Sequence, residues 1–130
     1  MGNYTISTTT PGPIEESRER VIAALAEEGF GVLTEIDVAA TMKTKLDVDI
    51  EPYRILGACN PPLAHRAITA EPSIGALLPC NVVLRQEGRT IVVDFLDPAA
   101  VLNLVEQEGI ADLADEVRAR LERVRAAVAG

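Results

Sequence analysis

Hydrophobic residues recur along the chain with two different periods, which predict where strands and helices lie. Alternating apolar and polar positions predict strands over 3–8, 30–38, 53–59, 80–86 and 89–96. Spacings of three and four residues predict two long helices over 13–28 and 110–128, and shorter ones over 39–46 and 61–70. The apolar face of the last helix comprises Ile110, Leu113, Ala114, Val117, Leu121, Val124 and Val128. Strand-rich segments framed by two long helices predict an α+β fold.

The clearest pair of strands is 80–86 with 89–96. Glu87 and Gly88, the two residues between them, suit a hairpin turn. That turn predicts three pairs of opposed apolar residues: Leu84 with Ile91, Val82 with Val93, and Cys80 with Phe95. We expect this apolar ribbon to pack against the two long helices.

A second apolar surface is predicted on the other side of the sheet. Its residues are Leu56, Ala58, Val83, Val92 and Leu96. Two long helices cover one face of a sheet of this size, so the other face is expected to meet a second subunit or a ligand. We therefore predict a homodimer.

Composition is that of an ordinary globular protein. The 130 residues are sufficient for one domain over 1–130. Hydrophobic residues make up 48% of the chain, which excludes a disordered protein. The net charge of −8 argues against a nucleic-acid partner, because phosphate binding needs a basic surface. No apolar run approaches the length of a membrane span, so no membrane partner is expected.

The start of the chain and its cysteine content bear on the cellular compartment. Residues 1–6 contain neither a basic segment nor an apolar stretch, so we expect no secretion signal. Two cysteines are too few for a disulfide framework. We therefore expect a cytoplasmic protein whose thiols are reduced.

Three segments carry motifs that resemble one known family. They are Gly29–Leu33, Ile55–Pro61 and Leu78–Val82, and the last two contain the cysteines. These motifs are similar to those of the domain-of-unknown-function 302 family of bacteria and archaea, and the resemblance covers nearly the whole chain. It implies a β-α-β(4)-α topology like that of TATA-binding protein, with an antiparallel sheet and two long helices on one face. It also implies a dimer, and no established reaction. The chain departs from the family pattern at Asp47, where glycine is expected, and at Pro62.

Cys59 and Cys80 are the first candidate functional residues. If strands 53–59 and 80–86 are antiparallel neighbours, both thiols lie at the same edge of the sheet. A right-handed parallel crossover instead places them at opposite edges. The family topology favours the first arrangement, which suits a soft metal ion, thiol chemistry or a small ligand. The alternative is that both are small buried hydrophobic residues, as free cysteines usually are.

Two further candidates follow Cys59. Asn60 is suited to cap the helix over 61–70, and His65, the only histidine, lies one turn into that helix. We predict a ligand site formed by Cys59, Asn60, His65 and Cys80. Cys59, Cys80 and His65 are the candidate metal ligands, and two-coordinate Cu(I) needs only the thiols. The alternative for His65 is an exposed helix residue. The sequence requires no cofactor.

These residues leave two classes of function open. The first is a small binding or accessory module, not an enzyme, that works as a homodimer and takes a small ligand. The alternative is a thiol-dependent enzyme or sulfur carrier, with Cys59 or Cys80 as nucleophile and His65 as its base. No carboxylate is placed to orient His65, so we favour the binding module.

Overall fold

Strands and helices follow one another in the order expected for an α+β fold. The computed structural model describes residues 4–129. Within this range the strands are β1 (Thr5–Pro11), β2 (Gly31–Asp37), β3 (Tyr53–Cys59), β4 (Cys80–Glu87) and β5 (Thr90–Leu96). The helices are α1 (Ile14–Glu27), α2 (Val38–Leu46), α3 (Pro61–Ala70), the 3₁₀ helix η1 (Pro72–Leu77), α4 (Pro98–Leu102) and α5 (Ile110–Val128). The α+β prediction is confirmed.

The first strand extends further than predicted at its C-terminal end. Asn3, where it was predicted to begin, lies outside the described residues. At its other end β1 continues past Thr8 to Pro11, because Thr9 and Thr10 pair with β5. Pairing with β5 therefore extends the strand to Pro11, although proline usually ends a strand. An edge strand such as β1 tolerates a proline.

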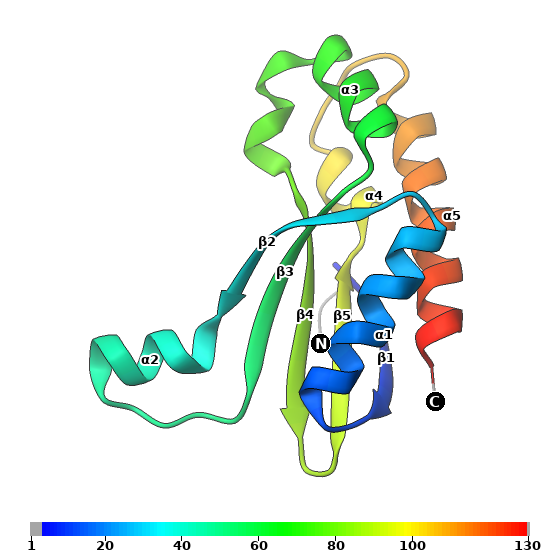
Figure 1. Cartoon of the computed structure of the whole chain (residues 1–130). Helices are drawn as coiled ribbons and strands as arrows, with labels where there is room; N and C mark the ends of the chain where they lie inside the picture. Colours follow the sequence, from blue (N-terminus) through cyan, green and yellow to red (C-terminus); the bar gives the residue numbers. More distant parts are fainter. Residues whose placement is uncertain (1–3, 130) are drawn as a thin grey trace.

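All strands of the described chain belong to one antiparallel sheet of order β1-β5-β4-β3-β2 (Figure 1). The connection from β3 through α3 and η1 returns the chain to an antiparallel neighbour, β4. Of the two arrangements considered for the cysteines, the antiparallel one is therefore present. Cys80 pairs with Ala58, the residue before Cys59.

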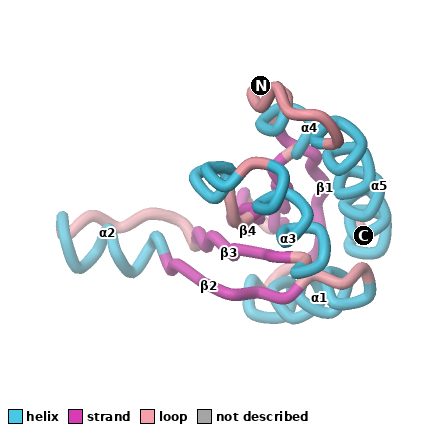
Figure 2. Tube along the Cα trace, turned by 90° about the horizontal axis from the view of Figure 1, so that it is seen from above, coloured by secondary structure: helices cyan, strands magenta, loops and turns pink. Residues whose placement is uncertain are grey.

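Helices α1 and α5 pack together and cover one face of the sheet (Figure 2). Leu25 of α1, Leu121 of α5 and Leu84 of β4 are all buried in the core between them. Every apolar residue predicted for the buried face of α5 is buried. Among residues 4–129, no helix is both long and apolar enough to cross a membrane.

The β4–β5 hairpin has a different register from the predicted one. Val82 pairs with Phe95 and Leu84 with Val93, a shift of two residues, and the turn consists of Gly88 and Arg89. The reason lies in Gly88, whose φ is +64°. A turn with glycine at its first central position is the type II′ hairpin, whereas the predicted turn required Glu87 there. A shift of two residues keeps the same side chains facing the helices.

The predicted second face was wrong for two residues. Leu56 pairs with Val82 and Ala58 with Cys80, so both side chains face the helices, and both are fully buried. Cross-strand pairing decides the face of each residue, and alternation within β3 alone does not reveal it. Val83 lies on the opposite face, as predicted, and is half-buried.

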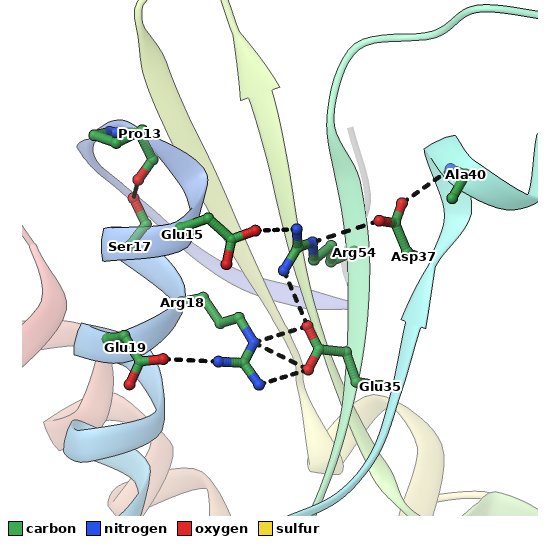
Figure 3. A network of polar contacts seen from close by, with 9 residues as sticks. All are labelled: Pro13, Glu15, Ser17, Arg18, Glu19, Glu35, Asp37, Ala40 and Arg54. Atoms are coloured by element: carbon green, nitrogen blue, oxygen red, sulfur yellow. Dashed lines mark hydrogen bonds and ion pairs between the residues drawn. The ribbon is translucent and has the colours of Figure 1, made fainter. Parts of the chain in front are cut away.

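Strand β2 and helix α2 form an arm that projects from the rest of the molecule (Figure 1). Its base is held by ion pairs between α1, β2 and β3 (Figure 3). The Arg18 guanidinium donates to both carboxylate oxygens of Glu35 at 2.7–2.9 Å. Arg54 donates to Glu35 at 3.3 Å and to Glu15. Helix α2, which lies further out along the arm and is described over its full length, has no buried side chain.

Candidate functional site

An apolar cavity of about 340 Å³ lies across the end of the sheet where β3 ends and β4 begins. Side chains from α3, η1, α4 and α5 line it together with the ends of the strands. Phe30, Leu63, Leu102 and Leu113 are typical of this lining. No charged side chain of residues 4–129 belongs to it. The cavity is therefore suited to hold apolar groups.

Both cysteines line this cavity, and both are free thiols. Cys80 starts β4 on the face covered by the helices, whereas alternation directs Cys59, at the end of β3, toward the other face. Both contribute to the lining because the cavity lies across the strand ends. Burial, reinforced by the nearby Cys59, raises the pKa of the Cys80 thiol to about 11. Cys80 is thus a neutral thiol at physiological pH and a weak nucleophile.

Asn60 also lines the cavity, and its side chain is occupied by backbone contacts. Its Oδ1 accepts a hydrogen bond from the Leu63 N–H at 3.4 Å, which caps α3 as expected. Its Nδ2 donates to the Glu28 carbonyl at 3.2 Å, just past the end of α1. Asn60 therefore holds α3, one wall of the cavity, against the end of α1.

His65 is not brought together with the cysteines. Its side chain is exposed on α3, and it does not contribute to the cavity lining. In the described part of the chain, no three His, Cys, Asp or Glu residues are grouped closely enough to hold a metal ion. Cys59, Cys80 and His65, predicted as three metal ligands, are therefore not grouped together in the described structure. Helix α3 turns this position outward, whereas Leu63 and Ala67 point into the core.

Two residues that sequence reasoning missed lie at the mouth of the cavity. Leu33 and Ile68 line it and remain 67% and 44% exposed. Leu33 is the extra residue of a β-bulge in β2. The signal for this bulge was Gly57 on the facing strand, since a Cβ there would lie 2.2 Å from Oγ1 of Thr34. A glycine inside a strand often marks such a close approach.

Comparisons with known proteins agree with this fold. The family described as "Domain of unknown function DUF302" matches residues 6–128. The chain is also similar to the crystal structure of an uncharacterized conserved protein DUF302 from Bacillus stearothermophilus. The two share 26% sequence identity and a TM-score of 0.89, over 97% of this chain and 98% of that one. A comparison with curated proteins gives no match.

Proposed function

Because this chain belongs to the DUF302 family, whose function is unknown, we propose its function from the cavity: it is a binding module, not an enzyme, for a small molecule. The observation that carries this proposal is the cavity of about 340 Å³ beside Cys59 and Cys80. Pockets for small molecules are commonly about 300–1,000 Å³, concave and mostly apolar. The site residues we retain are Cys59, Asn60 and Cys80.

Two observations argue against the alternative of a thiol-dependent enzyme or sulfur carrier. The raised pKa of Cys80 opposes formation of the thiolate that such chemistry needs. His65, the proposed base, lies outside the cavity lining. The unpaired thiols are consistent with the reducing cytoplasm, which we propose as the compartment.

Binding is tested with 2-naphthol, a neutral bicyclic molecule, by isothermal titration of the purified protein. We expect saturable binding with one site per chain. The matched variant is Ala64→Leu, which adds volume to a half-buried lining position of α3. It should weaken binding, while the exposed substitution Leu104→Ala should not. Binding that is unchanged by Ala64→Leu would place the site elsewhere.

We propose that the module works as a homodimer through the open face of the sheet. This face carries the half-buried Val83 and Val92 beside an ion pair between Arg85 and Asp94 at 2.9 Å. The projecting arm and the loop that follows it add exposed apolar side chains: Ile36, Leu46, Val48 and Ile50. A helix of nine residues, such as α2, gains most of its stability from packing, which a second copy would supply.

Light scattering across a dilution series tests the dimer. We expect a mass of twice 13.9 kDa, and dissociation in Val92→Asp, because a carboxylate would enter the apolar part of the interface. Leu104→Asp, on an exposed residue after α4, is the control. A mass of 13.9 kDa at every concentration would exclude the homodimer.

A further inference from the structure

The walls of the cavity specify the chemistry of its ligand. We propose that the cavity takes an uncharged, apolar molecule and excludes ions, and that the molecule enters between Leu33 and Ile68. This inference rests on the proposed binding function and names its ligand class and its route of entry.

Among residues 4–129, no charged side chain lines the cavity, and two arginines on helices that line it are paired with carboxylates. Arg66 of α3 pairs with Glu116 of α5 at 3.1 Å. Arg118 of α5 pairs with Asp97 at 3.3 Å. Neither arginine lines the cavity. An ionised ligand group would therefore be buried without a counterion, which is strongly unfavourable.

Helix α3 begins at the cavity, and its first amides are already used. Pro61 and Pro62 carry no N–H, although the start of a helix normally offers free donors to an anion. The next N–H, that of Leu63, is bonded to the Asn60 side chain, and that of Ala64 to the Asn60 carbonyl at 2.8 Å. Over this turn, within the described residues, no donor remains for a carboxylate or phosphate.

Helix α4 repeats this arrangement on another wall. Pro98, its first residue, lines the cavity and has no N–H. The Ala99 N–H is bonded to Asp97 Oδ1 at 2.9 Å, and the Ala100 N–H to the Asp97 carbonyl at 3.0 Å. Both helix starts beside the cavity therefore fail as anion sites for the same reason.

The remaining polar groups of the lining are weak or occupied. They are the two thiols, the Thr34 hydroxyl and the Asn60 amide. The Asn60 amide bonds to backbone, and Cys80 is neutral at physiological pH. The polar groups left for a ligand are thus a hydroxyl and the thiols. They can accommodate a ligand that carries an alcohol or phenol group, but a ligand without such a group also fits.

The volume sets the size of the ligand. A benzene molecule fits an apolar cavity of about 150 Å³, so the 340 Å³ present here accommodates about 14 non-hydrogen atoms by proportion. A molecule with two fused rings fits this range.

The mouth follows from two exposed side chains. Leu33 of β2 and Ile68 of α3 are the large lining residues that remain substantially exposed, and we take them as the rim at which the cavity opens to solvent. The bulge turns Leu33 out of the regular alternation of β2 and brings it to this opening. An apolar rim favours entry of an apolar molecule.

Three probes of one shape test the ligand class: 2-naphthol, 2-naphthoate and 2-naphthylmethylammonium. At pH 7 these are neutral, anionic and cationic, and titration calorimetry measures their affinity for the intact chain. We expect the neutral probe to bind at least about tenfold more tightly than either ion, because an ion must be buried unpaired. Equal affinity of an ion overturns the ligand class but leaves the binding function standing. Failure of all three to bind the folded protein overturns both.

The route is tested with Leu33→Asp and Ile68→Asp. A carboxylate at the rim should weaken 2-naphthol binding by about tenfold, because the bound molecule would cover the charge and remove it from water. Leu104→Asp, at a residue that is more exposed than either rim residue and lies outside the cavity lining, should bind like the parent chain. Leu33→Ala replaces Leu33→Asp if thermal unfolding shows that the charged variant is not folded.

A second readout uses the cysteines as reporters. In a Cys80→Ala variant, 2-naphthol should slow alkylation of Cys59 by N-ethylmaleimide, and the two rim variants should abolish this protection. If both rim variants bind and protect like Leu104→Asp, the ligand enters elsewhere and the proposed route is wrong.

Discussion

A Cβ atom on Gly29 would lie 2.9 Å from Nδ2 of Asn60, so the two residues fit together only because position 29 has no side chain. The same Nδ2 donates to the carbonyl of Glu28. The end of α1 and the start of α3 therefore meet at one close contact. This contact sets the position of α3, and with it one wall of the cavity.

Replacing Gly29 with alanine should destabilise the protein by about 1–3 kcal/mol, because position 29 also has a φ of +85°. Urea denaturation measures the loss. Gly31→Ala is the matched control, since its φ is not positive and a Cβ there meets no described atom within 4 Å. A Gly29→Ala protein as stable as Gly31→Ala would contradict the contact with Asn60.

Two adjacent residues of β4 should respond differently to truncation. Leu84→Ala should cost about 2–5 kcal/mol, because Leu84 is fully buried between the sheet and the helices. Val83→Ala, on the open face, should cost less than about 1 kcal/mol in the monomer. Chemical denaturation at low protein concentration compares them. A reversed order would mean that the core lies on the other side of the sheet.

Asp47 ends α2 in the left-handed conformation, with a φ of 53°. Asp47→Gly should therefore stabilise the end of α2 by up to about 1 kcal/mol, since glycine adopts this conformation without strain. The exposed ion pair with Lys43 is lost, at little cost. Amide hydrogen exchange in α2 measures the effect. Asp47→Ala, which keeps the strain and removes the ion pair, should not slow exchange.

Acid should weaken the anchor of the arm through Glu35. Hydrogen bonds from Arg18, supported by Arg54, hold the pKa of the Glu35 carboxyl below its ordinary value of 4.5. A carboxylate with a lowered pKa stabilises the fold above its unfolded pKa, and this contribution is lost as pH falls through the folded value. Denaturant midpoints at pH 7 and pH 3 should therefore differ less in Glu35→Gln than in the parent chain. Glu51→Gln, in an exposed loop, should behave like the parent.

The reactivity of Cys80 should depend steeply on pH. In Cys59→Ala, alkylation by iodoacetamide should be slow at pH 7 and accelerate as pH rises toward the Cys80 pKa of about 11. The reason is that only the thiolate attacks the reagent. Cys59 contributes to the raised pKa of Cys80, so its removal should lower this pKa slightly. Rapid alkylation at pH 7 would revive the thiol-dependent alternative.

The sequence predicts the elements well where local signals agree. Helix α3 begins and ends as predicted because Asn60 caps it and Pro61 favours the first turn. Helix α5 is likewise predicted over its full length, since its apolar spacing matches one buried face. In both helices, the residues that determine where the helix begins and ends lie within the helix or directly beside it.

Pairing between segments is harder to predict. The predicted register of the β4–β5 hairpin differs from the observed one by two residues, because the same alternation of apolar residues fits both registers. The positive φ of Gly88 distinguishes them. The predicted face of Leu56 is wrong because the face depends on which residue of β4 lies opposite it, and the pairing of β3 with β4 decides this. Local patterns leave both choices undetermined.

The candidate site was found only in part for the same reason. Cys59 and Cys80 lie on adjacent antiparallel strands, as the family topology implied. His65 is close to Cys59 in sequence, but the direction of its side chain depends on how α3 packs. The cavity is assembled from segments far apart in the chain, so no single motif reveals it.

The bulge at Leu33 has a further consequence for the outer edge of the sheet. An edge strand exposes backbone groups to which another chain can add a strand, the first step toward fibrils. The bulge interrupts that row in β2, and Glu35 turns its charge toward α1. At the opposite edge β1 ends at Pro11, which has no N–H to offer. Strand addition is therefore disfavoured at both edges, so copies of this chain should associate into closed assemblies and resist growth into continuous sheets.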